Sequence, residues 1–116
     1  MITIEQIKAN RAKWIAALKS GKYTQGQGCL RKNGKYCCLG VAADVLGCVW
    51  EKGANNVNDK CSFNGERAHV FLPIAFHNML GLSKDYEIKL TKLNDTNGLK
   101  FEVIANYIES LPIITE

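Results

Sequence analysis

Two adjacent cysteines, Cys37 and Cys38, are the residues of this 116-residue chain that could most directly carry covalent chemistry. If a helix begins near Tyr36, Cys37 lies in its first turn, where the helix dipole and the neighbouring Lys35 could lower the thiol pKa towards the reactive range. The alternative is that both cysteines are small buried hydrophobes. A cysteine hydrolase would also need a histidine base, and no pattern ties either histidine of the chain to Cys37. We therefore predict no catalytic residue.

The five cysteines and two histidines match no metal-binding template, because the chain has neither a Cys-x-x-Cys nor a His-x-x-x-His pair. An odd number of cysteines excludes complete internal disulfide pairing. The N-terminus lacks the pattern of a secretion signal, and the uncharged apolar run 37–43 is far shorter than the roughly 18 residues of a membrane span. We predict a cytoplasmic protein with reduced thiols, no metal, no cofactor and no membrane partner.

The first third of the chain is strongly basic within a net charge of +4. Such a segment attracts phosphates, nucleotides, nucleic acids or an acidic protein surface, although it could equally be an ordinary solvated helix face and loop. Sequence-specific nucleic-acid binding is not expected, because no helix carries clustered Arg, Asn and Gln side chains. Between residues 8 and 35 there is no acidic residue and there are eight basic ones: Lys8, Arg11, Lys13, Lys19, Lys22, Arg31, Lys32 and Lys35.

The residue types around this basic segment predict a site for a small nucleotide-like anion. Two tyrosines could stack on a base and a glutamine could read its edge, while basic side chains hold phosphates and an Asn-Asp pair bonds a ribose. The alternatives are packing for the tyrosines and turn formation for the Asn-Asp pair. The predicted ligand-binding residues are Tyr23, Gln25, Arg31, Lys35, Tyr36, Cys37, Asn94 and Asp95, with Lys32 as a further phosphate contact.

Local patterns predict the elements that position these residues in the first half of the chain. Thr3 and Gln6 fit a capping box before a helix over 4–19. Asn-Gly at 33–34 predicts a β-hairpin over 28–37. The apolar spacing after Tyr36 predicts a central buried helix that Gly47 closes. Gly40 inside that helix indicates close packing against another backbone, such as that of the first helix.

The second half of the chain begins with a polar stretch, 51–65, which predicts a long loop. A short helix over 74–80 follows, with a proline in its first turn and a glycine at its end. Residues 83–92 fit either a strand or a helix, and 94–98 form a turn cluster. The spacing over 101–111 predicts a last helix. Together these elements indicate an α+β fold: one mostly helical domain over 1–116 with a small β-hairpin.

Three patches of the sequence resemble a group of small proteins encoded by phages and prophages. They read W-x-x-A-L-x-S-G-x-Y-x-Q over 14–25, Y-C-C-L-G-V-x-x-D over 36–44, and L-N-D at 93–95 followed by F-x-x-I-A-x-x-I over 101–108. Relatives often carry a small capping residue before the phenylalanine of the last patch, where this chain has Lys100. The resemblance implies no catalytic residue.

The resemblance also implies a setting, because accessory phage genes of this size commonly counter host defences. We therefore expect a non-enzymatic counter-defence protein of the host cytoplasm that sequesters a small anion such as a nucleotide immune signal. Pockets of this kind in small proteins often form between subunits, so we expect a homo-oligomer. The alternative is an interaction module whose basic face inhibits a host protein. A cysteine-dependent or nucleotide-cleaving enzyme is a third interpretation.

Overall fold

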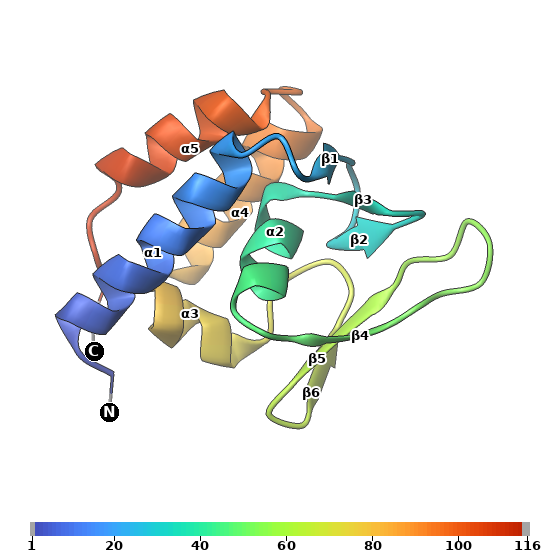
Figure 1. The fold of residues 1–116 in the computed structure, drawn as a ribbon, viewed down its shortest axis with the longest axis horizontal. Coiled ribbons are helices and arrows are strands. Elements are labelled where there is room, and N and C mark those ends of the chain that lie inside the picture. Colours follow the sequence, from blue (N-terminus) through green and yellow to red (C-terminus); the bar gives the residue numbers. More distant parts are fainter. Residues whose placement is uncertain (1, 115–116) are drawn as a thin grey trace.

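The computed structural model describes residues 2–114. Most of its helices pack against helix α1 (Ile4–Lys19). It contacts α2, α3 and α5, and Figure 1 shows the helices on one side of the molecule and two small sheets on the other. The predicted capping box is confirmed, with the Thr3 hydroxyl accepting from the Gln6 N–H at 3.1 Å. Trp14 is fully buried, and its indole Nε1 donates to the Cys38 carbonyl at 2.8 Å, which fixes α1 on α2.

Arg11, which the sequence analysis counted in the basic segment, is buried and is not part of an exposed basic face. Its guanidinium donates to the carbonyls of Leu80, Leu111, Gly81 and Pro112 at 2.7, 2.7, 2.9 and 2.9 Å. Burial lowers the pKa of the guanidinium. A buried cation needs such partners, so this residue joins α1 to the ends of two other helices and attracts no external anion.

The predicted hairpin is confirmed, and it belongs to a three-stranded sheet. In that sheet β3 is central, paired in parallel with β1 and antiparallel with β2. Asn33 and Gly34 have φ angles of 52° and 77°, the positive values that a tight two-residue hairpin turn requires. The strands are β1 (Thr24–Gln25), β2 (Arg31–Lys32) and β3 (Lys35–Tyr36).

Helix α2 (Cys38–Val45) is the predicted central helix, but Cys37 precedes it as the N-cap instead of lying in its first turn. The Cys37 Sγ accepts from the Gly40 N–H at 3.4 Å. A Cβ on Gly40 would overlap the Leu30 carbonyl group, 2.8 Å from its carbon. The close packing inferred for Gly40 is therefore against Leu30, in the segment before β2, and not against α1.

A second three-stranded sheet borders the polar stretch 51–65, for which the sequence predicted a long loop. It is antiparallel, in the order β4-β5-β6. The loop prediction is correct for residues 52–59 but wrong for residues 60–63, which form a short strand. The turn after that strand is a second Asn-Gly pair, Asn64-Gly65, with φ angles of 51° and 81°, which is a hairpin signal. The strands are β4 (Val49–Glu51), β5 (Lys60–Phe63) and β6 (Glu66–Ala68).

Three helices complete the α+β fold: α3 (Ile74–Leu80), α4 (Lys84–Asp95) and α5 (Phe101–Ser110). The segment that fitted strand or helix is helical because Ser83 caps it, its Oγ accepting from the Tyr86 N–H at 3.2 Å. Asn94 and Asp95 are consequently the last residues of α4, so the turn begins at Thr96, two residues later than the predicted cluster at 94–98. No helix within residues 2–114 is long and apolar enough to cross a membrane.

Candidate functional site

The β2–β3 hairpin divides the predicted site residues between two faces. The strands pair Arg31 with Tyr36 and Lys32 with Lys35, and paired residues of a sheet share a face whereas successive residues alternate. The Arg31 Cζ lies 4.5 Å from the centre of the Trp50 ring, on the first face. Lys32 and Lys35 line a cavity on the second face. The two basic residues predicted to hold phosphates together, Arg31 and Lys35, are therefore separated.

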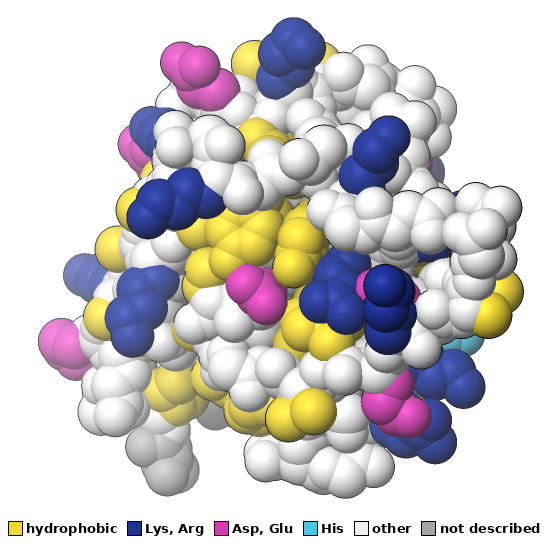
Figure 2. All heavy atoms as spheres, turned by 45° about the vertical axis from the view of Figure 1, so that its right-hand side comes forward, with side chains coloured by type: hydrophobic (Ala, Val, Ile, Leu, Met, Phe, Trp, Pro, Cys, Tyr) yellow, Lys and Arg dark blue, Asp and Glu magenta, His cyan; other side chains and the backbone are white. Residues whose placement is uncertain are grey.

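Tyr23, Tyr36 and Trp50 form an aromatic cluster on the first face. Neighbouring rings meet edge to face, with centroid distances of 4.9 Å and 6.0 Å. Asp44 fixes two of them, accepting from the Tyr23 hydroxyl at 2.5 Å and from the Trp50 Nε1 at 3.0 Å. Burial, with the hydrogen bond to Asp44, raises the pKa of Tyr23. Figure 2, which turns the sheet side forward, shows hydrophobic side chains at the centre of the face with basic side chains on either side.

Arg31 is occupied by a carboxylate of the protein. Its Nε lies 2.5 Å from the Oδ2 of Asp59, a buried residue whose other oxygen accepts from the Gly53 N–H at 2.7 Å. The charge of Arg31 is thus balanced inside the fold, and the pair fastens the loop between β4 and β5 to β2.

Gln25 and Asn94 are the centre of a polar network that joins three elements. Gln25 Nε2 donates to Asn94 Oδ1 at 2.9 Å and to the Leu99 carbonyl at 2.7 Å. Its Oε1 accepts from the Phe101 N–H at 3.2 Å and so caps α5, a role that the Lys100 side chain does not fill.

Asn94 is fully buried and holds the start of α2 as well. Its Oδ1 accepts from the Cys38 N–H at 3.3 Å, and its Nδ2 donates to the Gly26 carbonyl and to Asp95 Oδ1, both at 2.8 Å. The amide that the sequence assigned to a ribose therefore has all of its polar atoms engaged by the protein.

The adjacent cysteines lie in the core. Burial raises the pKa of Cys37 to about 12 and that of Cys38 well above its usual range. Of the two alternatives for these cysteines, the structure favours small buried hydrophobes over a thiol activated by the helix dipole and Lys35, because loss of water around the sulfur raises the pKa. Within residues 2–114 no group of three or more Cys, His, Asp or Glu is arranged to hold a metal ion.

Two adjoining cavities of about 390 and 280 Å³ lie on the second face of the hairpin. They share Gly26, Gln27 and Lys35. Three lysines and no carboxylate line them. We call this feature the lysine groove and define it by Gln25, Gly26, Gln27, Lys32, Lys35 and Lys100. Sequence reasoning missed Gln27 and Lys100 as site residues; the run Gln-Gly-Gln-Gly over 25–28 was the available signal.

A protein-family model covers nearly all of these features. It is described as a domain of unknown function, DUF8296, and matches residues 5–111. The chain belongs to this family. The match includes the whole lysine groove and the aromatic cluster, so both lie inside the family's domain. No curated protein and no solved structure matches the chain.

Proposed function

We propose that this DUF8296 protein binds and sequesters a small anionic ligand, of nucleotide-like chemistry, in the lysine groove. The observation that carries the proposal is the convergence of Lys32, Lys35 and Lys100 on two adjoining cavities with no carboxylate in their lining. Ammonium groups in such a setting attract phosphate oxygens. Sequestration needs affinity and specificity but no reacting group, which suits a lining whose one thiol, Cys29, has a pKa raised by burial.

The backbone of the groove is closely packed at Gly26. A Cβ on Gly26 would lie 2.7 Å from the Cβ of Lys35, so only glycine lets β1 and β3 pair at this position. Gln27 adds an amide group to the lining, and its Nε2 donates to the Asn94 carbonyl at 3.2 Å. The two volumes together reach the size range of small-molecule sites, about 300–1,000 Å³.

The predicted site residues take different roles in this proposal. Lys35 and Gln25 line the groove, with Lys32 beside them. Asn94 accepts a hydrogen bond from Gln25, and Asp95 accepts one from Asn94. Cys37 precedes Cys38, whose N–H donates to Asn94. Tyr23, Tyr36 and Arg31 lie on the other face of the hairpin, where they hold the sheets together. Base stacking by the two tyrosines is not part of the proposal.

The biological setting rests on the resemblance to phage and prophage proteins. It supports a counter-defence role in the cytoplasm of the host, with a nucleotide immune signal as the ligand. The groove is open to solvent, and Lys35 and Lys100 are exposed. A second copy of the chain would cover it and exclude water, so the proposal includes a homo-oligomer. The same exposure would let an acidic loop of a host protein bind there, which is the alternative function.

The test is native mass spectrometry of the reduced protein mixed with cyclic and linear nucleotides. We expect a mass increment of one intact nucleotide per site, which Lys35→Glu with Lys100→Glu abolishes. The matched control is Lys89→Glu with Lys92→Glu, the same charge change at exposed positions of α4. Recovery of a cleaved nucleotide would indicate an enzyme instead. A protein that stays bare with every nucleotide would overturn the proposal and favour a host protein as the target.

A further inference from the structure

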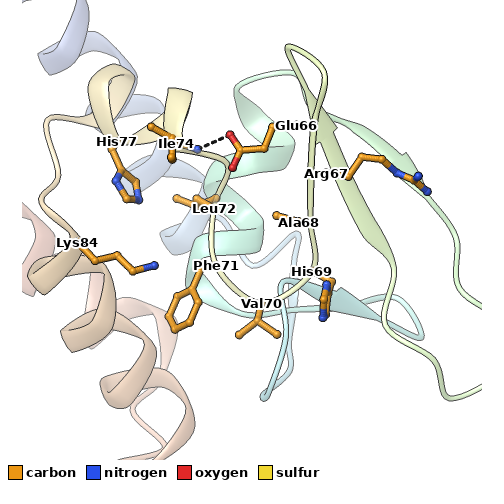
Figure 3. A pocket seen from close by; sticks show the side chains of 10 residues that line it. All are labelled: Glu66, Arg67, Ala68, His69, Val70, Phe71, Leu72, Ile74, His77 and Lys84. Carbon is orange, nitrogen blue, oxygen red and sulfur yellow. Dashed lines mark hydrogen bonds between the residues drawn. The ribbon is translucent and has the colours of Figure 1, made fainter.

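A larger cavity, of about 630 Å³, lies beside β6 and the helices α3 and α4 and shares no lining residue with the lysine groove. One wall is apolar and consists of Val70, Phe71, Leu72 and Ile74 (Figure 3). Two of these large side chains are turned to solvent: Phe71 is 36% exposed and Ile74 is 67% exposed. An apolar wall that the rest of the chain leaves uncovered is typical of a ligand site.

A buried carboxylate organises the polar side of the cavity. Glu87 is fully buried, and its Oε2 accepts from the Leu72 N–H at 2.6 Å. Its Oε1 lies 2.8 Å from His77 Nε2 and 3.3 Å from Lys84 Nζ. These contacts hold the imidazole and the ammonium group at the cavity, because each is tied to a residue that cannot move towards solvent.

Lys84 is the cation best placed to meet a ligand. In Figure 3 its side chain extends from α4 into the space between His77, Leu72 and Phe71. Its Nζ lies 3.9 Å from the centre of the Phe71 ring. An ammonium group has three N–H donors, and the long contact with Glu87 uses one of them. Donors are therefore available next to an apolar surface.

The other charged groups of the lining are engaged elsewhere. The Oε1 of Glu66 accepts from the Ile74 N–H at 2.8 Å, at the start of α3. Arg67 forms an ion pair with Glu51 at 2.7 Å. His69 also lines the cavity, and the Nε2 of His77 is taken by Glu87. Lys84 is thus the cation whose remaining donors lie beside Phe71 on the apolar wall, and Glu87 has its oxygens occupied.

We propose that this cavity binds a small amphipathic carboxylate, whose aromatic or acyl body packs on Phe71 and Ile74 and whose carboxylate contacts Lys84. The body replaces water on the apolar wall, which is the larger part of the affinity. The carboxylate supplies direction, because Lys84 stands at one end of that wall. This ligand class differs from the phosphate-bearing ligand of the lysine groove, and the two sites are independent.

The probe is sodium 2-naphthoate, titrated into uniformly ¹⁵N-labelled protein and followed by ¹H–¹⁵N correlation spectra. We expect saturable shifts at the amides of residues 70–72, 74–77 and 84–87, and weaker binding of the neutral analogue 2-naphthamide. Lys84→Met keeps the contact with Phe71 and removes the charge, so the affinity should fall about tenfold, as for the loss of one charged hydrogen bond. Lys92→Met, at an exposed position of the same helix, should leave it unchanged.

A second pair of variants keeps the test independent of any effect of Lys84 on folding. Ile74→Glu places a negative charge on an exposed part of the wall and should abolish the shifts. Val103→Glu makes the same change at a residue of α5 that is 50% exposed and does not line the cavity, and it should have no effect. The proposal is overturned if the probe does not saturate in the millimolar range, if Ile74→Glu binds like Val103→Glu, or if the shifts centre on Lys32 and Lys35.

Discussion

The side chains of Arg31 and Lys35 lie on opposite faces of the hairpin formed by β2 and β3. Arg31 is paired in the strand register with Tyr36 and bound to Asp59, whereas Lys35 is paired with Lys32 and lines the lysine groove. The two cations of this basic segment therefore have different roles: Arg31 stabilises the fold, and Lys35 is available to a ligand.

Neutralising these two residues should therefore have different effects. Arg31→Gln leaves Asp59 buried without its cation and should lower the free energy of unfolding by about 2 kcal/mol, less than for a fully buried pair because Arg31 is partly solvated. Lys35→Gln should change stability by less than about 0.5 kcal/mol and weaken nucleotide binding. Urea unfolding followed by tryptophan fluorescence measures the first effect, and native mass spectrometry the second. Equal losses of stability would contradict this difference in roles.

Asn94 should be far more important for stability than its position near a turn suggests. Asn94→Ala removes four hydrogen bonds and leaves the Cys38 N–H and the Gly26 carbonyl without their partner. Unsatisfied buried groups cost about 1–3 kcal/mol each, so we expect a loss of about 3 kcal/mol. Asn97→Ala, at an exposed residue just after α4, is the control and should be nearly neutral. A mild Asn94→Ala phenotype, matching that of the control, would show that the network is dispensable.

The sequence predicted those elements whose signals are local. Thr3 with Gln6 locates the start of α1, and Asn33-Gly34 locates the hairpin turn, because in each case the interacting groups are neighbours in the chain. The second sheet was missed because its pairing joins separated segments, although Asn64-Gly65 marks one of its turns.

The candidate site was predictable to a similar extent. Basic residues and amide side chains were recognised, and the alternation of strand side chains already separates Lys35 from Tyr36 once the hairpin is accepted. The contact between Gln25 and Asn94 was not predictable, since no pattern in either segment specifies the other. It exists only because α4 packs on α2 and the end of α4 lies beside β1, and it moves Asn94 from the expected ligand site into the core.

Gly40 offers a test in which helix propensity and packing predict opposite signs. Alanine at an exposed position inside a helix is more stable than glycine by about 1 kcal/mol. A Cβ at Gly40, however, would lie 2.8 Å from the Leu30 carbonyl carbon and closer still to its oxygen. Because backbone is a rigid neighbour, we expect Gly40→Ala to destabilise the protein by about 3 kcal/mol or to prevent folding. Thermal unfolding by circular dichroism measures the sign, and a raised melting temperature would contradict the close approach of Leu30 and α2.

The buried thiol of Cys37 should make the protein sensitive to alkali. Its pKa is raised from 9.0 to about 12 by burial, so the folded state holds a proton that the unfolded state releases above pH 9. Stability from this group is therefore complete below pH 9 and is lost between pH 9 and 12, by up to about 1.4 kcal/mol per pH unit. Urea unfolding at pH 8, 9, 10 and 11 measures the slope, and Cys37→Ala should make it shallower by about one proton. The groups Tyr23, Cys29, Cys38 and Cys48, whose pKa values are also raised, add to the total slope, so the difference between the wild type and Cys37→Ala is the quantity that reports Cys37. A slope that Cys37→Ala leaves unchanged would mean that the thiol reaches solvent before the fold is lost, and that the reactive interpretation of this cysteine has to be reopened.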